Sequence, residues 1–284
     1  MRICTTVAEV REARRALPDP LGLVPTMGAL HDGHLALVRR ARAENASVAV
    51  SIFVNPTQFT SADDFGRYPR DTQRDITLLA NEGVDLVFLP RVEAVYPTGH
   101  STSVDVGPIA RAFEGAARPG HFTGVATVVT MLLNIVQPQT AYFGQKDAQQ
   151  LAVVSRLVTD LALPVEIVPV PTVRDSDGVA LSSRNVLLSP SARSAAAAIP
   201  QALADVRAAW ESGQRDAAQL REVLHRRLGS EPAITIDYAT LVDPASFAEC
   251  DGTIDGDALV IVAVIAGGVR LIDNWLLPRG SVST

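Results

Sequence analysis

Residues 21–44 read LGLVPTMGALHDGHLALVRRARAE: a short apolar run, a glycine-containing turn and a longer amphipathic stretch. The apolar run at 21–24 predicts a strand, and the three- and four-residue spacing of apolar side chains at 35–44 predicts a helix. A second apolar run, at 48–54, predicts the next strand. Strand, helix and strand in this order form a βα unit, so this stretch decides in favour of an α/β fold.

The same alternation of short apolar runs and amphipathic stretches continues to about residue 171. We therefore expect a Rossmann-like, doubly wound parallel sheet with helices on both faces. The remaining predicted strands lie at 84–89, 140–143 and 165–170, and the remaining predicted helices at 71–81, 123–136 and 148–161.

The alternation of apolar runs and amphipathic stretches ends after residue 171. Residues 173–185 are polar and predict a loop at a domain junction, and Ser189-Pro190 has the residue types of a helix start. Strands are predicted at 235–242, 258–265 and 269–272, with a hairpin turn at Gly267-Gly268. We expect a larger α/β domain over residues 1–184 and a smaller C-terminal α+β domain over residues 185–284.

Composition excludes several classes of protein. Hydrophobic residues make up 47% of the 284 residues and charged residues 20%, which is typical of a globular chain. The net charge of −6 disfavours nucleic-acid binding, and Cys4 and Cys250 stand too far apart to suggest a disulfide framework or a thiolate metal site. The longest nearly uninterrupted apolar run, 258–269, is too short to cross a bilayer, so we expect a soluble cytoplasmic protein with no membrane partner.

The turn at residues 25–34, PTMGALHDGH, lies where a parallel sheet binds ligands, between a strand and a helix N-terminus. Its glycines allow close backbone approach, and His31 and His34 can both face one polyphosphate. A turn with two histidines that bind no ligand would have the same sequence pattern. A zinc site is disfavoured because no third and fourth ligand follow at suitable spacing. The dinucleotide and P-loop glycine fingerprints are absent, which disfavours ordinary dehydrogenases and P-loop kinases.

Four further segments carry chemistry-bearing residues at predicted strand ends or in the junction loop. GQKDAQQ at 144–150 offers Lys146 beside a helix start, and LSSRN at 181–185 offers hydroxyl, guanidinium and amide donors for phosphate. NPTQF at 55–59 includes Gln58, which can donate to and accept from a hydroxy acid, and RPGHFTGV at 118–125 precedes a long apolar helix. Each segment alone also fits a solvated loop, but together they indicate one site.

These segments, with YPRD at 68–71, resemble those of the pantothenate synthetase (pantoate–β-alanine ligase) family, within the HxGH nucleotidylyltransferase superfamily. The resemblance runs through nearly the whole chain, with Leu181 where the family usually has Met. It implies that ATP and (R)-pantoate give an enzyme-bound pantoyl adenylate and pyrophosphate, and that β-alanine then releases pantothenate and AMP. It also implies Mg²⁺ with the ATP and a homodimer.

The resemblance assigns roles to individual residues. It makes His31, His34, Lys146 and Arg184 catalytic, Gln58 and Gln150 ligands of pantoate, and Gln58 a ligand of β-alanine. Asp75 is a candidate contact to Mg²⁺. The implied ATP-binding residues are Met27, Gly28, Ala29, Leu30, His31, Asp32, Gly33, His34, Gly144, Gln145, Lys146, Asp147, Val173, Leu181, Ser182, Ser183 and Arg184.

Two other functions remain open on the sequence. A nucleotidylyltransferase that moves AMP onto a phosphorylated acceptor would share the HxGH turn, but it would need an added basic pocket for the acceptor phosphate. A nucleotide-binding regulatory module without turnover would be expected to lack His34, Lys146 or the Ser-Ser-Arg run, and all of these are present.

Overall fold

The computed structural model describes residues 1–279, with the backbone alone at residues 62–64, and the chain forms two compact units. Unit 1 contains Met1–Gln145 and Gln149–Pro171. Unit 2 contains Lys146–Ala148 and the chain from Thr172 onward.

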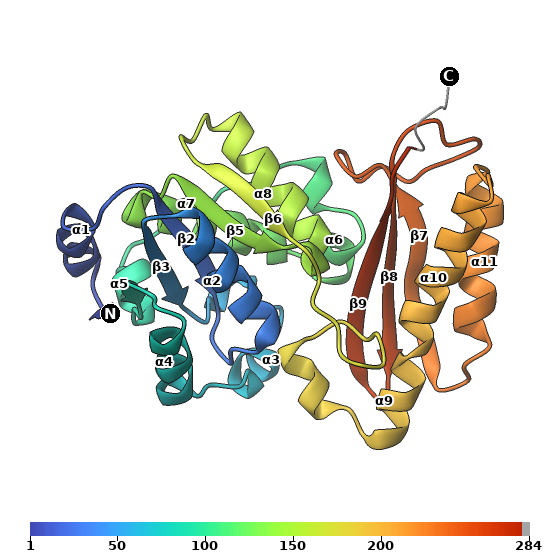
Figure 1. Ribbon diagram of the computed structural model, residues 1–284, viewed down its shortest axis with the longest axis horizontal. Helices are drawn as coiled ribbons and strands as arrows, with labels where there is room; N and C mark the ends of the chain where they lie inside the picture. Colours follow the sequence, from blue (N-terminus) through green and yellow to red (C-terminus); the bar gives the residue numbers. More distant parts are fainter. Residues whose placement is uncertain (280–284) are drawn as a thin grey trace. The chain divides into compact units, whose positions relative to one another are not determined.

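Unit 1 is built on a six-stranded parallel sheet with the strand order β1-β4-β3-β2-β5-β6 (Figure 1). The five strands predicted from apolar runs are all present, which confirms the Rossmann-like fold. The strands are β1 (Arg2–Cys4), β2 (Leu21–Thr26), β3 (Ser47–Ile52), β4 (Leu86–Phe88), β5 (Thr140–Gly144) and β6 (Glu166–Val170).

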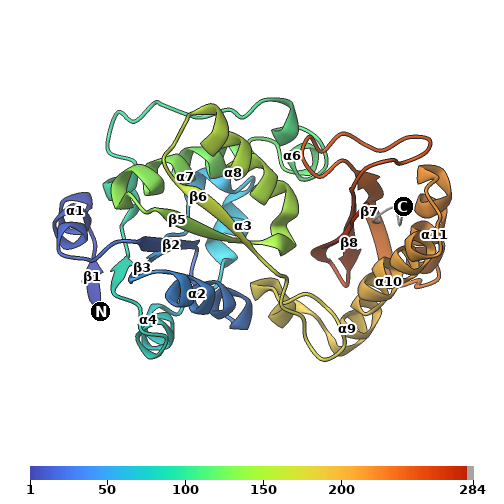
Figure 2. The ribbon, with the colours of Figure 1, turned by 45° about the horizontal axis from the view of Figure 1, so that its top comes forward.

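Helices cover both faces of this sheet. On one face, α2 (Asp32–Glu44) and α4 (Thr72–Asn81) bury Val38 and Leu79 against the strand residues Val50 and Val87. On the other face lie α7 (His121–Val136) and α8 (Ala148–Asp160), which Figure 2 shows above the sheet. The shorter helical segments of this unit are α3 (Ala62–Arg67), α5 (Val92–Val95), α6 (Glu114–Ala117) and the 3₁₀ turns Pro56–Gln58, Pro108–Ala110 and Gln145–Asp147.

The direction of the strand crossovers reverses between β2 and β5. From β2 the chain passes through α2 to β3 on one side, and from β5 it passes through α8 to β6 on the other side. In open α/β sheets this reversal leaves a crevice at the carboxyl ends of the two strands, where ligands bind. The turn after β2 and the turn after β5 both emerge there.

The N-terminal elements were not predicted from the sequence. β1 is only three residues long and pairs with β4 at the edge of the sheet, and α1 (Val7–Arg15) follows it. The Thr6 hydroxyl caps α1 by accepting a hydrogen bond from the Glu9 backbone nitrogen, and the Glu9 carboxylate accepts one from the Thr6 backbone nitrogen. This capping box was readable from the residue types, whereas the short edge strand has too few residues to show a pattern.

Unit 2 packs helices against one face of an antiparallel sheet with the order β7-β8-β9. The predicted hairpin is confirmed, because Gly267 and Gly268 take φ values of +56° and +79° between β8 and β9. Its core joins Leu203, Leu220 and Leu224 to Val260 and Val262. The elements are α9 (Pro190–Ala196), α10 (Ala198–Glu211), α11 (Ala217–Gly229), β7 (Ile234–Val242), β8 (Ala258–Ala266), β9 (Val269–Leu277) and the 3₁₀ segment Ser183–Leu187.

The boundary between the units falls at Pro171 and Thr172, before the position 184/185 expected from the sequence. The physical reason is that residues 172–184 make their contacts inside unit 2: Val179 belongs to its core, and Arg174 is paired with Asp273. Residues 280–284 of the predicted second domain lie outside the described residues. Within residues 1–279 we find no helix with the length and apolar character of a membrane span.

The start of α7 touches the turn after β3 with little space between them. A Cβ atom on Gly124 would lie 2.5 Å from the Thr57 carbonyl oxygen and 2.7 Å from the Gln58 nitrogen. Only glycine lets the helix approach this backbone, so Gly124, the second glycine of the RPGHFTGV segment, has a packing role.

Replacing Gly124 with alanine is expected to lower the free energy of unfolding by about 1–3 kcal/mol, because the helix must move away from Thr57. Urea denaturation followed by circular dichroism measures the change. The control is Gly66→Ala in α3, where the added Cβ meets no described atom within 4 Å beyond its chain neighbours and its own helix backbone, so stability should stay level or rise by about 0.5–1 kcal/mol. Equal losses in the two variants would contradict the packing argument.

Candidate active site

The turn after β2 and the first turn of α2 are joined by two histidines that cap the helix reciprocally. His31 is the N-cap, and its Nδ1 accepts a hydrogen bond from the Gly33 nitrogen at 3.2 Å. Three residues later, His34 Nδ1 accepts from the His31 nitrogen at 3.4 Å, and the two ring centroids are 4.1 Å apart. The HxxH spacing therefore has a local cause, the geometry of a capping box.

This cap sets the tautomer of both rings. A neutral imidazole whose Nδ1 accepts a hydrogen bond carries its proton on Nε2, so both histidines present an N–H donor from Nε2. The helix N-terminus adds the positive end of its dipole. Two imidazole donors and a helix N-terminus in one turn form a suitable site for a polyphosphate.

The turn after β3 holds Gln58 in a network of defined polar contacts. Gln58 is only 7% exposed; its Oε1 accepts from Asn55 Nδ2 at 3.0 Å, and its Nε2 points at Met27 Sδ, 3.2 Å away. Met27 lies in the turn after β2. The structure thus brings Gln58 to the turn that contains His31 and His34, as the sequence analysis expected.

Two residues of the RPGH segment hold the backbone of Gln58. His121 is buried and donates from Nδ1 to the Gln58 carbonyl oxygen at 2.8 Å, and Arg118 Nη2 donates to the same oxygen at 3.3 Å. Arg118 Nη1 lies 3.3 Å from His121 Nε2, which fits a ring protonated at Nδ1. This segment therefore fixes the backbone of Gln58 rather than its side-chain amide.

Tyr96 is a residue of this site that the sequence analysis missed. Its hydroxyl donates to Asn55 Oδ1 at 2.9 Å, and Asn55 in turn orients Gln58. Burial raises the pKa of the Tyr96 phenol, so the hydroxyl keeps its proton and remains a donor. No spacing rule links Tyr96 to Asn55, since the contact crosses from the end of α5 to the turn after β3.

The turn after β5 carries Lys146, the only lysine among the 25 lysine and arginine residues of the chain. Its side chain is 20% exposed, and Nζ lies 3.8 Å from the Asp147 carboxylate. Its carbonyl oxygen accepts a hydrogen bond from Asn274 Nδ2 at 2.9 Å, and both residues belong to unit 2. Asn274 on β9 thus fixes the backbone of the lysine.

The two neighbouring glutamines of α8 have different surroundings. Gln149 is buried; its Nε2 donates to the carbonyl oxygens of Ile109 and Ala112, and its Oε1 accepts from the Glu114 nitrogen. These bonds use the amide group of Gln149 to hold the segment before α7. Gln150 is half-buried and is the glutamine the sequence analysis selected.

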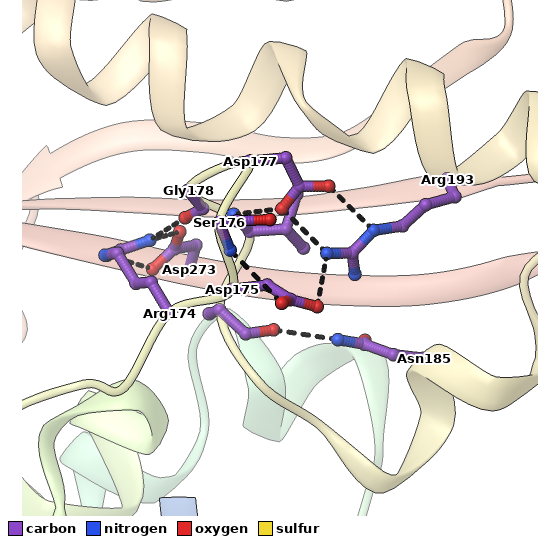
Figure 3. Close-up of polar contacts among 10 residues, drawn as sticks. Arg174, Asp175, Ser176, Asp177, Gly178, Asn185, Arg193 and Asp273 are labelled. Carbon is purple, nitrogen blue, oxygen red and sulfur yellow. Dashed lines mark hydrogen bonds and ion pairs between the residues drawn. The ribbon is translucent and has the colours of Figure 1, made fainter. Parts of the chain in front are cut away.

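The LSSRN segment belongs to unit 2 and follows in the chain a loop that ion pairs hold (Figure 3). Arg174 forms a bidentate pair with Asp273, with distances of 2.6 and 2.9 Å, and Arg193 pairs with Asp175 and Asp177. The sequence predicts a polar loop here, and these pairs hold its first half.

The second half of this loop presents the predicted phosphate donors. Asn185 Nδ2 donates to the Ala180 carbonyl oxygen at 3.0 Å, and the Ser182 hydroxyl caps the following 3₁₀ segment by accepting from the Arg184 nitrogen at 3.3 Å. Ser182, Ser183 and Arg184 are all half-buried. Local hydrogen bonds therefore hold the short stretch between Ala180 and Asn185 in a turn.

Asp75, the expected contact to Mg²⁺, lies against the backbone of the turn after β2. It is 1% exposed, and its two carboxylate oxygens accept hydrogen bonds from the backbone nitrogens of Ala29 and Leu30, each at 2.8 Å. The structure shows Asp75 as the acceptor for two backbone nitrogens of this turn, and its contact to Mg²⁺ stays a prediction. Among the side chains that the structure describes, at residues 1–61 and 65–279, no three from His, Cys, Asp or Glu gather in a metal-binding group.

Comparison with known proteins gives a consistent result. The family model described as pantoate-beta-alanine ligase matches residues 2–276. The chain is 56% identical to a pantothenate synthetase of Chloroflexus aurantiacus over 98% of both chains, and 53% identical to that of Gluconobacter oxydans over 98% of this chain and 100% of the relative.

Solved structures show the same similarity. A crystal structure of pantothenate synthetase from Thermus thermophilus matches with a TM-score of 0.91 and 51% identity, covering 97% of this chain and 99% of that one. A pantoate-beta-alanine ligase from Francisella tularensis, complexed with beta-gamma ATP and beta-alanine, matches with a TM-score of 0.78 and 35% identity over 97% of both chains. With the turns after β2, β3 and β5 in place, these matches show that the chain belongs to the pantoate-beta-alanine ligase family.

Proposed function

We propose that this chain joins (R)-pantoate to β-alanine at the expense of ATP, through a pantoyl adenylate. The observation that carries the proposal is the pairing of a polyphosphate site, the His31 and His34 cap, with Gln58 at the neighbouring strand end, where Gln58 Nε2 lies 3.2 Å from Met27 Sδ. The relative from Francisella tularensis, with beta-gamma ATP and beta-alanine bound, supports the same substrates here.

In the first step of the proposal, a carboxylate oxygen of pantoate attacks the α-phosphorus of ATP and pyrophosphate leaves. Both reactants are anions, so the reaction needs donors placed where negative charge develops. His31 and His34 donate from Nε2, Lys146 supplies a compact positive charge, and the amide groups of Gln58 and Gln150 hold pantoate. We assign ATP contacts to the residues that the family resemblance implies, including Val173 and Leu181–Arg184.

In the second step, the neutral amine of β-alanine attacks the acyl carbon of the adenylate, the amide bond forms and AMP leaves. Gln58 orients β-alanine in this proposal. The amine loses a proton as the bond forms, and the enzyme forms no covalent bond to substrate. Because a mixed anhydride hydrolyses readily, the loop containing Ser182, Ser183 and Arg184 is assigned the exclusion of water.

Three further proposals rest on the family resemblance. We propose that Mg²⁺ accompanies ATP, held by the phosphates, and we assign it no protein ligand because Asp75 is engaged with backbone nitrogens. We also propose a homodimer and a cytoplasmic location.

The reaction class is tested by exchange of labelled pyrophosphate into ATP. Exchange should require pantoate and proceed without β-alanine, since the adenylate forms before the amine enters. Nicotinamide mononucleotide and phosphopantetheine serve as the alternative acceptors. If either of them supported exchange as well as pantoate does, the proposed ligase activity would be wrong and a nucleotidylyltransferase would be favoured.

His34→Ala and Lys146→Ala should each lower the rate of adenylate formation by about 10²–10³, with a much smaller effect on ATP binding, because these groups act on charge that develops in transfer. Single-turnover kinetics and calorimetry separate the two quantities. His225→Ala is the control for the histidine, since His225 contacts the Ala239 carbonyl oxygen in unit 2. A variant with a near-normal rate and only weaker ATP binding would refute the assignment.

Arg184→Ala should slow adenylate formation and raise the amount of AMP released per pantothenate, because water reaches the anhydride. Hydrogen exchange should also slow at residues 181–184 when ATP and pantoate bind together, and much less at residues 174–178, where the ion pairs already hold the loop. The control is Arg226→Ala, an exposed arginine paired with Glu222. Unchanged product ratio and exchange on ligand binding would contradict the role given to this loop.

A further inference from the structure

The turn that carries the histidine cap has an unfavourable backbone conformation. Gly28 has a φ of +82° and Ala29 a φ of +51°, so two successive residues lie in the left-handed region. Alanine rarely adopts this conformation, and it persists only where surrounding contacts enforce it. The contacts that hold Ala29 are therefore part of what shapes the site.

Asp75 supplies these contacts from the first turn of α4. One carboxylate oxygen accepts from the Ala29 nitrogen and the other from the Leu30 nitrogen, each at 2.8 Å. A Cβ on Gly28 would lie 3.0 Å from Asp75 Oδ2, so the missing side chain makes room for the carboxylate. Only a group with two acceptor oxygens satisfies both nitrogens, because an amide would turn an NH₂ group toward one of them.

Arg74 holds the same segment through a carbonyl oxygen. Its Nη1 donates to the Leu30 carbonyl oxygen at 3.0 Å, so consecutive residues of α4 bind both the N–H and the C=O of Leu30. Leu30 itself is 1% exposed. Asp71 caps α4 by accepting from the Arg74 nitrogen at 3.1 Å, which fixes the turn that carries both residues.

We propose that Asp75, assisted by Arg74, is a positioning residue for adenylate formation: it locks residues 28–30 so that His31, His34 and the N-terminus of α2 meet the phosphates in a fixed place. Asp75 does not touch the substrate in this role. The inference rests on the proposed function, and it replaces the expected magnesium contact with a structural one. A displacement of about 1 Å at such a site can cost about 10²-fold in rate.

The test compares Asp75→Asn with Asp85→Asn. Asp85 also accepts a hydrogen bond from a backbone nitrogen, that of Val48 at 2.8 Å, and it forms an ion pair with Arg42. It lies at the amino ends of the strands, away from the turns that follow them. The expected result for Asp75→Asn is a fall of about 10–100-fold in the single-turnover rate of adenylate formation, with a smaller change in the ATP dissociation constant and faster amide exchange at residues 28–34. Asp85→Asn should leave the rate within about twofold even if it lowers the melting temperature.

Arg74→Gln provides a second variant that keeps the buried carboxylate, since Arg74 is exposed on α4. Arg74→Gln should also lower the single-turnover rate of adenylate formation, by less than Asp75→Asn does. If Asp75→Asn does not fold, this variant tests whether the contacts from α4 position the turn. Magnesium titration separates the two roles of Asp75. An unchanged magnesium requirement supports positioning, whereas a defect in Asp75→Asn that excess Mg²⁺ restores would overturn it.

Equal rate losses in the Asp75 and Asp85 variants would also overturn the proposal, because they would trace the effect to general destabilisation. Failure of the proposed function would look different. The unaltered protein would then form no pantoyl adenylate, while amide exchange at residues 28–34 would still report whether Asp75 holds the turn.

Discussion

The reversal of strand order between β2 and β5 is the constraint on which the candidate site of unit 1 depends. Parallel strands send all their carboxyl ends to one edge of the sheet, and the reversal leaves that edge open between β2 and β5. The turns that follow β2 and β3 meet there because these two strands are neighbours. Residues far apart in the chain, such as Met27 and Gln58, thereby come within contact distance.

The polar side chains at this edge are held in defined orientations by backbone groups. His31 and His34 accept hydrogen bonds at Nδ1 and so carry their protons on Nε2, whereas His121 donates from Nδ1 to the Gln58 carbonyl oxygen. Opposite tautomers of one residue type thus serve opposite purposes: two present a donor, and one supports a neighbouring turn. A site that must stabilise developing charge gains from such fixed groups, because they need no reorganisation during the reaction.

A second layer of residues supports the first in unit 1. Gly124 allows α7 to approach the turn after β3, Tyr96 and Asn55 orient Gln58, and Asp75 holds the turn after β2. In unit 2, the Arg174–Asp273 pair and the neighbouring Asn274 place β9 against both the polar loop and the backbone of Lys146. Several segments that resemble the family therefore have a scaffolding role beside any contact with substrate.

The sequence by itself determined the α/β fold, the predicted strands of the parallel sheet, the β8–β9 hairpin and the segments that form the candidate site. These follow from local patterns: apolar periodicity, glycine at turns, and polar residues at strand ends. Tertiary structure decided what depends on partners distant in the chain. The edge strand β1, the unit boundary at Pro171, the contact of Tyr96 with Asn55 and the use of Asp75 as a backbone acceptor all belong here. The physical reason is that a carboxylate has the same sequence signature whether it binds a metal ion or two backbone nitrogens, and only the folded chain shows which of them it meets.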